Sequence, residues 1–405
     1  MSPSCLTSPV RNSRSFAPIA GALSAGIAFC GWGGCGGWGI AAAQTASPPV
    51  LVTITDKGCE PNVLTVPAGK TTFRIRNQSR RALEWEILDG VMVVEERENI
   101  IPGFVQSLTA TLKAGQYQMT CGLLSNPKGV LTVQATAAAA GASTAAAGST
   151  PSSSGADAPD LAGPLAEYKI YVTKEVDNLV DQTKRFTDAV KTGKLKEAQD
   201  LYAPTRQHYE RIEPVAELFN DLDKSIDARA DDFEKKEKDP AFVGFHRIEK
   251  ALFADKSTAG MAPVADRLMR DILDLQKRIA TLDIPPDKMV AGAADLIEEV
   301  AATKISGEED RYSGTDLWDF QANIDGSQKI FDLLRPLIVK KNPALAARVA
   351  ANFAKVDAVL GRHRGGDGRF QNYDKLPQSD HNVLKGAVTI LAEDLSQLRG
   401  TLGIE

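Results

Sequence analysis

Residues 135–163 read ATAAAAGASTAAAGSTPSSSGADAPDLAG and separate two parts of the chain that differ in character. This segment is almost wholly Ala, Ser, Thr, Gly and Pro. Such a composition buries too little apolar surface to offset the entropy lost on ordering, so it predicts a flexible linker. A chain of 405 residues is long enough for two or three domains. We therefore expect one domain at 44–134 and another at 164–405.

The part before the linker has the pattern of strands. Short runs of β-branched or alternating apolar residues are separated by turn signals such as Pro67-Ala68-Gly69. About 85 residues of this kind predict a small all-β sandwich. The expected strands are 51–55, 62–66, 71–76, 105–112, 116–120 and 130–133.

The part after the linker has the pattern of helices. Apolar residues recur there at spacings of three and four, with charged residues on the opposite faces. The short connections predict antiparallel neighbours in an all-α bundle. The expected helices are 168–191, 204–237, 264–282, 287–304, 317–337, 345–360 and 382–402.

The first 43 residues have the layout of a secretory signal peptide. Arg11 and Arg14 are their only charged residues, a weakly apolar stretch follows, and Ala41-Ala42-Ala43 offers small residues for cleavage. A membrane anchor is the alternative, but glycine interrupts the stretch too often for a good spanning helix. No later run approaches 18 apolar residues. We expect an exported, periplasmic protein whose mature chain does not insert into the membrane.

The charge balance argues against nucleic acid as a partner. The chain has 47 Lys and Arg against 52 Asp and Glu, a net charge of −5, so it offers no overall basic field.

Cysteine usage fits export but leaves two interpretations open. Of five cysteines, only Cys59 and Cys121 follow the expected signal peptide. In an oxidising compartment such a pair is normally a disulfide. The alternative is that the two sulfur atoms are metal ligands.

The β-domain contains no histidine, because all four histidines lie at or after His208. A blue-copper centre needs two His and a Cys, so type 1 copper electron transfer is excluded for this domain alone. The remaining candidate ligands are sulfur and carboxylate groups: Cys59 and Glu60, Glu84 and Glu86, Glu95, Glu96 and Glu98, and Met119 and Cys121. Sulfur ligands suit Cu(I), and clustered carboxylates suit Fe(III). The alternative is a structural disulfide with a solvated acidic surface.

The helical part carries a His-x-x-Glu pattern. His246 and Glu249 are separated by three positions, so both side chains leave one face of a helix and could hold one ion. The segment 304–313 is rich in acids, and Asp316 and Asp319 repeat the same spacing at the start of an expected helix that Thr315 caps. An imidazole with several carboxylates suits iron or zinc. The His-Glu-x-x-His and Gly-x-Ser-x-Gly motifs of hydrolases are absent from the sequence.

Several segments together resemble the EfeO family of periplasmic iron-uptake components. The likeness covers nearly all of the chain after the expected signal peptide, apart from the linker. The segments that carry it are DKGCEP (56–61), ALEWEIL (82–88), VMVVEERENI (91–100), MTCGL (119–123), GFHRIEK (244–250) and 306–321.

The resemblance implies a cupredoxin-like domain joined to an imelysin-like helical domain of the M75 peptidase class. It further implies iron, ferrous or ferric, as the cargo, with copper in the cupredoxin-like domain and zinc as a surrogate. The implied partners are an inner-membrane iron permease and a haem-containing, peroxidase-like periplasmic protein. The chain would capture iron and deliver it to the permease.

Three metal sets follow from the resemblance. The first is Cys59, Glu84, Met119 and Cys121, the second is Glu95, Glu96 and Glu98, and the third is His246 with Glu249. On chemical grounds we add Asp271, Glu309 and Asp316 as ligands that complete the third set. An unperturbed imidazole is protonated below about pH 6.5, so we expect the affinity of the third set to fall at acid pH.

Two other functions remain open from the sequence. One is an M75-type metallopeptidase, although Glu249 cannot be both a metal ligand and a free general base. The other is a binding protein for anionic ligands or polysaccharides, with Arg362, His363, Arg364 and Arg369 as a basic patch. We expect metal binding rather than catalysis.

Overall fold

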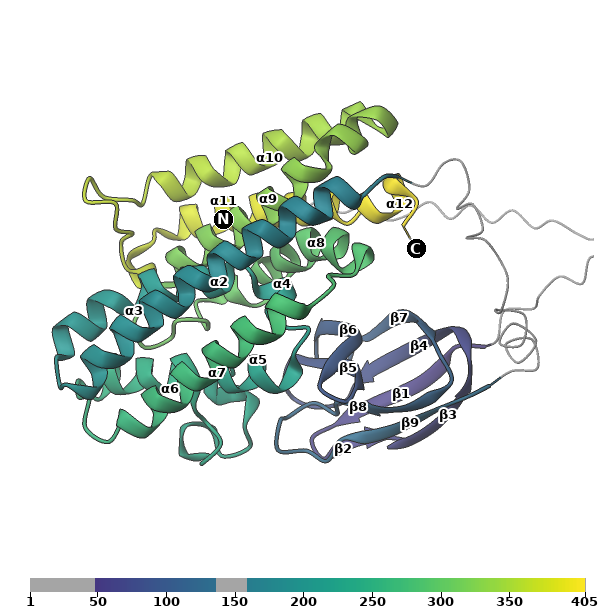
Figure 1. The fold of residues 1–405 in the computed structure, drawn as a ribbon, viewed down its shortest axis with the longest axis horizontal. Coiled ribbons are helices and arrows are strands. Elements are labelled where there is room, and N and C mark those ends of the chain that lie inside the picture. Colours follow the sequence, from purple (N-terminus) through teal and green to yellow (C-terminus); the bar gives the residue numbers. More distant parts are fainter. Residues whose placement is uncertain (1–47, 136–158, 405) are drawn as a thin grey trace, which may run out of the picture. The chain divides into compact units, whose positions relative to one another are not determined.

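The computed structural model describes residues 48–135 and 159–404 (Figure 1). The expected signal peptide, residues 1–43, and most of the expected linker lie outside the described residues. The first described helix, α2, begins at Ala162, so the last two residues of the expected linker are helical.

Two sheets form the domain at 48–135. One has the strand order β2-β1-β4-β7, and the other has the order β3-β9-β8-β5-β6. β1 runs parallel to β4 and β3 runs parallel to β9, while the other neighbours are antiparallel. The strands are β1 (Val50–Thr55), β2 (Gly58–Glu60), β3 (Val63–Pro67), β4 (Gly69–Asn77), β5 (Leu83–Asp89), β6 (Met92–Ile100), β7 (Val105–Leu112), β8 (Gly115–Met119) and β9 (Gly129–Gln134).

The core of this sandwich follows from the period of two along each strand. Val52 and Ile54 are buried on β1, and Phe73 is buried on β4. Trp85 of β5, in the other sheet, lies against Phe73 with the ring centroids 5.1 Å apart. Alternate side chains of both sheets therefore meet in one apolar layer.

A disulfide also joins the two sheets. Cys59 in β2 and Cys121, two residues after the end of β8, are bonded at 2.03 Å, and both are buried in the core of the sandwich. Of the two interpretations of this cysteine pair, the structure contains the disulfide.

The sequence locates six of these strands to within two residues. It misses β2, β5 and β6. β6 contains Glu95, Glu96, Arg97 and Glu98 in succession, and most of its residues are half-buried, so the strand has no alternating apolar pattern. β5 places glutamates on both sides of Trp85. Because charged residues occupy partly buried positions in β5 and β6, these strands lack the alternation of apolar and polar residues by which strands are recognised in a sequence.

The part at 159–404 is a helical bundle, as expected. α2 packs against α3 and α7, α8 packs against α9 and α11, and α10 packs against α9 and α11 (Figure 1). The helices are α2 (Ala162–Lys191), α3 (Leu195–Glu210), α4 (Glu213–Ala216), α5 (Asn220–Ile226), α6 (Gly244–Glu249), α7 (Ala262–Thr281), α8 (Pro286–Ala302), α9 (Asp316–Lys341), α10 (Pro343–Gly361), α11 (Gln378–Leu395) and α12 (Leu398–Leu402), with short turns η1 (Ala230–Asp232), η2 (Lys236–Lys238), η3 (Lys250–Ala254), η4 (Lys304–Ser306) and η5 (Tyr373–Lys375).

The apolar faces that the sequence predicts form the core of the bundle. On α7, for example, Leu268, Ile272, Leu275 and Ile279 are buried at helical spacing. Within the described ranges, no helix combines the length and apolarity needed to cross a membrane.

The expected helix 204–237 is wrong, because the chain there is broken into several short elements. α3 ends at Glu210, and α4, α5, η1 and η2 follow. The break follows from Pro214, whose ring would clash with the carbonyl four residues earlier, at Glu210, if the helix continued. The consequence is that Asp227, just after α5, lies in an irregular segment rather than on a helix face.

α6, which carries His246 and Glu249, begins at a glycine with a left-handed backbone. Gly244 has φ +77°, and a Cβ atom there would lie 2.2 Å from the carbonyl oxygen of Ile226. Only glycine allows the start of α6 to approach the end of α5 this closely. α6 continues into the π-helical turn η3.

The disulfide generates a prediction about stability. Replacing Cys59 and Cys121 together by serine should lower the free energy of unfolding of the β-domain by about 2 to 4 kcal/mol, because the unfolded chain regains the entropy of a long loop. Urea unfolding followed by tryptophan fluorescence measures this loss, in proteins that also carry Trp318→Phe so that Trp85 is the one tryptophan after residue 43. Reduction of the disulfide in the unmodified protein should lower the free energy of unfolding by the same amount. Equal stability of the oxidised and reduced proteins would contradict the prediction.

Gly244 generates a second prediction. Gly244→Ala should lower the free energy of unfolding of the helical domain by about 1 to 3 kcal/mol, through backbone strain and the close contact with Ile226. The matched control is Gly366→Ala, because a Cβ at Gly366 meets no atom within 4 Å. That control should stay within about 0.5 kcal/mol of the unmodified protein. Equal unfolding temperatures of Gly244→Ala and Gly366→Ala would contradict this prediction.

Candidate metal centre

His246 and Glu249 lie together on α6, and both are buried. The Nδ1 atom of His246 is 3.2 Å from Oε2 of Glu249. The other oxygen of Glu249 accepts hydrogen bonds from the backbone N–H groups of Tyr312 and Ser313, both at 2.8 Å, and from the Ser313 hydroxyl at 3.0 Å. Glu249 thus orients the imidazole and fixes the loop that precedes α9.

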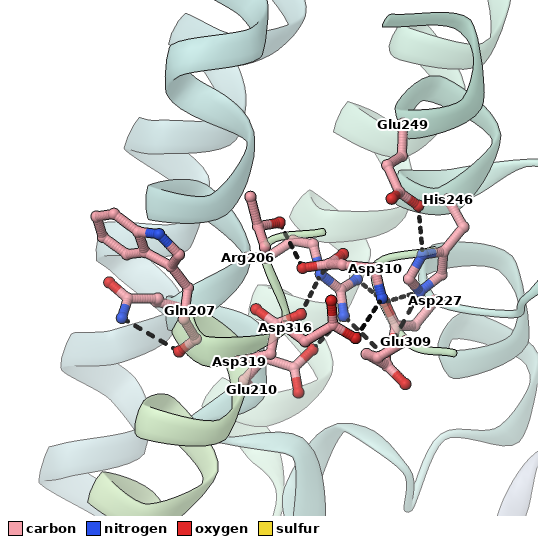
Figure 2. Close-up of polar contacts among 12 residues, drawn as sticks. Arg206, Gln207, Glu210, Asp227, His246, Glu249, Glu309, Asp310, Asp316 and Asp319 are labelled. Carbon is pink, nitrogen blue, oxygen red and sulfur yellow. Dashed lines mark hydrogen bonds and ion pairs between the residues drawn. The ribbon is translucent and has the colours of Figure 1, made fainter. Parts of the chain in front are cut away.

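The other ring nitrogen of His246 faces two carboxylates from different segments. Nε2 lies 3.5 Å from Oδ1 of Asp227 and 3.6 Å from Oε1 of Glu309. Both distances exceed a normal hydrogen bond, and this buried nitrogen has no hydrogen-bond partner among the described residues. A buried polar atom without a partner calls for an explanation. Figure 2 shows the three side chains directed toward one another.

The spacing of these three residues suits a metal ion. One ligand atom from each of Asp227, His246 and Glu309 lies within 4.8 Å of the others. Two atoms that bind one ion at about 2.1 Å in tetrahedral geometry lie about 3.4 Å apart, close to the 3.5 and 3.6 Å between Nε2 of His246 and the two carboxylate oxygens. One nitrogen and several carboxylate oxygens form a donor set for iron, zinc or manganese.

Asp310 forms a second group with His246 and Glu249. Its two carboxylate oxygens accept hydrogen bonds from the Tyr202 hydroxyl at 2.9 Å and from the Thr315 hydroxyl at 2.6 Å. Thr315 therefore serves Asp310 and makes no side-chain cap on α9, contrary to the expectation from sequence. The side of His246 that faces Asp227 and Glu309 is the better ion site, because Nε2 has no hydrogen-bond partner among the described residues whereas Nδ1 already faces Glu249.

Positive charges surround the carboxylates. Glu309 accepts hydrogen bonds from Arg229 at 2.7 Å and from Arg206 at 3.0 Å. Burial raises the pKa of Glu309, but the charges of Lys304 and Arg229 outweigh burial and hold the pKa well below its usual range. Glu309 is therefore an ionised carboxylate in the interior.

The pKa of His246 moves in the opposite direction from that expected of a buried histidine. Burial and the charge of Arg206 lower this pKa, but the carboxylates of Glu249, Glu309 and Asp227 raise it to about 10. The imidazole without a metal is therefore protonated over a wider pH range than the unperturbed value of about 6.5 suggests. A metal ion that binds Nε2 of His246 would have to displace a proton from the ring.

The structure brings together three of the residues predicted for the third set, namely His246, Glu249 and Glu309. Asp271 on α7 is not part of this cluster. It accepts a hydrogen bond from the Ser225 hydroxyl and forms an ion pair with Arg267. Asp316 is buried, and one of its oxygens accepts a hydrogen bond from the backbone N–H of Asp310 at 3.3 Å. Asp316 thus supports the loop and is not grouped with His246.

The candidate ligands of the β-domain are engaged in other contacts. The disulfide uses the sulfur atoms of Cys59 and Cys121, and Met119 is buried beside Cys121 in the core of the sandwich. Glu84 is paired with Lys224.

The three glutamates of the second set lie on β6. Glu95 is paired with Lys288 at 3.3 Å. Burial raises the pKa of Glu96 to about 8 and that of Glu98 well above its usual range, and neighbouring carboxylates add to both shifts.

Sequence reasoning missed Asp227, Asp310 and Arg206. Asp310 lies in the acid-dense segment 304–313, and this density was a usable signal. Asp227 had no comparable signal, because it reaches His246 only through the close approach of α5 and α6 at Gly244. Nothing in the pattern around Arg206 distinguishes it from an arginine on the surface of a helix.

The contacts of Glu249 argue against this residue as the general base of a zinc peptidase. A general base in such an enzyme must have an oxygen free to activate water. In this structure one oxygen of Glu249 accepts three hydrogen bonds and the other faces His246.

The basic patch expected near residue 364 is also engaged within the chain. Arg369 pairs with Asp200 at 2.9 Å, Arg364 lies 4.4 Å from the centre of the Phe370 ring, and His363 lies 3.0 Å from Asp380.

Asp231 generates a prediction about pH. This residue of η1 is paired with Arg311, which follows Glu309 and Asp310 in the loop, and with Lys236 at 2.8 Å. Burial raises the pKa of Asp231, but the bonds with Arg311 and Lys236 outweigh it and lower the pKa to about 2. A carboxyl whose pKa is lowered on folding stabilises the folded state above its unfolded pKa of about 3.9 and loses that contribution as the pH falls toward 2.

Asp231→Asn should therefore lower stability at pH 7 but have little effect near pH 2. The difference at pH 7 should be below about 1 kcal/mol, because the ion pairs are partly exposed to solvent. Thermal unfolding of both proteins from pH 7 to pH 2 measures it. A difference that grows toward low pH would contradict the assignment.

Two family models match the chain, one over the helical part and one over the β-sandwich. A family model described as imelysin, of the peptidase M75 class, matches residues 164–398, more than half of the chain. A model described as a cupredoxin-like domain matches residues 27–133.

Curated relatives match over most of their length. The iron uptake system component EfeO of Escherichia coli O6:H1 (strain CFT073) is 62% identical over 358 residues, which cover 88% of this chain and 92% of the relative. The proteins of the same name from Escherichia coli K12 and Shigella flexneri are each 61% identical, with the same coverage. The chain therefore belongs to the EfeO family of iron uptake system components, with a cupredoxin-like domain followed by an imelysin domain.

Proposed function

We propose that this protein captures iron at His246, Asp227 and Glu309 in its helical domain and delivers it to an inner-membrane iron permease. The named relatives are components of an iron uptake system, and this role is the starting point of the proposal. The contribution of the chain is a buried site, with ligands from three separate segments, that holds the ion during transfer.

The observation that carries the proposal is the Nε2 atom of His246. It is buried, faces the carboxylates of Asp227 and Glu309, and has no hydrogen-bond partner in the described part of the chain. The two carboxylates lie too far away for a normal hydrogen bond with this nitrogen, and their positions suit a metal ion shared by all three groups. Glu249 on the opposite ring nitrogen completes the arrangement common to metal-binding histidines, in which a carboxylate fixes the ring.

Iron fits this donor set better than Cu(I) does. Carboxylates and imidazole are hard and intermediate ligands, which suit Fe(II), Fe(III) and zinc, whereas Cu(I) prefers sulfur. The sulfur atoms of Cys59 and Cys121 are joined to each other, so a copper site at Cys59, Glu84, Met119 and Cys121 remains a prediction for the reduced protein alone.

The periplasm is the proposed location. The disulfide supports this placement, since such bonds persist in oxidising compartments. The permease and a peroxidase-like periplasmic protein are the proposed partners, on the strength of the family alone.

Metal titration of the complete mature chain tests the proposal. Fe(II) under anaerobic conditions, Fe(III) as a soluble chelate and Zn(II) should each be titrated by calorimetry. His246→Ala should weaken Fe(II) binding at least 10-fold, which corresponds to about 1.4 kcal/mol. Glu309→Gln should also weaken it, because an ionised ligand becomes a neutral amide.

His208→Ala is the matched control. His208 also pairs with a carboxylate, Glu175 at 2.7 Å, but among the described residues it belongs to none of the groups that could hold an ion. This variant should bind Fe(II) as the unmodified protein does. Unchanged Fe(II) affinity in His246→Ala would refute the assignment of the site, and absence of iron binding in the unmodified protein would refute the proposed function.

A further inference from the structure

The interior beside the proposed metal site contains a second group of carboxylates, and a guanidinium lies at its centre. Arg206 of α3 is fully buried. All three of its nitrogen atoms are engaged, as Figure 2 shows. Nε donates to Asp319 at 2.9 Å and lies 3.6 Å from Asp310. The carboxylates around it are Asp227, Glu210, Glu309, Asp310 and Asp319.

These carboxylates have the spacing of a metal site. One oxygen from each of Glu210, Glu309 and Asp319 lies within 4.8 Å of the others, and all three residues are buried. In addition, Oδ1 of Asp319 is buried without a hydrogen-bond partner among the residues that the structure describes. The group therefore still has an acceptor that the guanidinium does not use.

The two groups share ligands. Asp227 and Glu309 belong to the group around His246, and the same two side chains also bond Arg206. Sites that hold two metal ions are built in this way, with carboxylates common to both ions and the ions about 3.5 to 4 Å apart. Here the guanidinium occupies the place that a second ion would take.

We propose that Arg206 is an internal cation that keeps the metal centre mononuclear. It is a positioning residue that orients Asp227 and Glu309 and fills the neighbouring carboxylate cage. This inference rests on the proposed function, because it concerns how many ions the His246 centre takes. A guanidinium suits the role because it stays charged at every physiological pH and offers donors in a fixed planar fork.

Removing the guanidinium should therefore raise the number of bound ions from one to two. Arg206→Ala leaves several buried carboxylates without their cation and could fail to fold. The main variant is therefore the double substitution Arg206→Ala with Asp310→Asn, which removes one charge of each sign. It keeps Glu210, Glu309 and Asp319, the three carboxylates with the spacing of a metal site, for a second ion. Arg206→Lys is the control, since it retains the positive charge.

The measurement is a titration of the full mature chain with Mn(II) alone, read by electron paramagnetic resonance and by metal analysis after gel filtration. The unmodified protein and Arg206→Lys should bind one ion and give the spectrum of isolated Mn(II). The double variant should bind two and give the spectrum of an exchange-coupled pair. A merely structural role for Arg206 would change thermal stability without producing that coupled signal.

The outcomes separate the two claims. One ion in the unmodified protein that is lost in His246→Ala, with one uncoupled ion in the double variant, would overturn the inference and leave the proposed function standing. No Mn(II) in the unmodified protein would overturn the inference of a mononuclear centre, whether or not the double variant binds an ion. The proposed function is decided separately by the Fe(II) titration, because Mn(II) binds such ligands more weakly than Fe(II) does.

Discussion

Burial of charge in a helical interior is the constraint on which the rest of the centre depends. Carboxylates removed from water cost several kcal/mol each unless cations and hydrogen bonds compensate them. Arg206 supplies that compensation on one side. Lys304 supplies it on the other, where its ammonium group lies 3.0 Å from Glu210, 2.7 Å from Glu213 and 3.1 Å from Glu299. The bundle closes around an internal ionic network rather than around apolar side chains alone.

This network connects elements that are distant in sequence. Arg206 joins α3 to the start of α9 through Asp319 and to the end of α5 through Asp227. Glu249 joins α6 to the loop at residues 312 and 313. Each bond fixes one side chain around His246, so the ligand positions are set by the packing of several helices. Buried networks of this kind favour a single arrangement because each unpaired member is costly.

The sequence predicts the two domains and most of their elements, because apolar periodicity records which face is buried. It also predicts that His246, Glu249 and Glu309 belong to one metal site, through helical spacing and local acid density. The structure brings these side chains close together, and metal binding by them stays a prediction. It could not place Asp227, whose approach depends on the backbone of Gly244. Nor could it exclude Asp271, a carboxylate of suitable type that is bonded to Ser225 instead. Spacing along a helix is visible in a sequence, whereas contacts between non-adjacent elements are not.

The two oxygens of Glu249 contact two different parts of the candidate site. One oxygen faces the imidazole. The other accepts hydrogen bonds from two backbone N–H groups of the loop that also carries Glu309 and Asp310. A displacement of that loop would therefore move Glu309 away from His246 and break the hydrogen bonds of Glu249 in the same movement. The loop thus couples the position of one candidate ligand to the orientation of the imidazole.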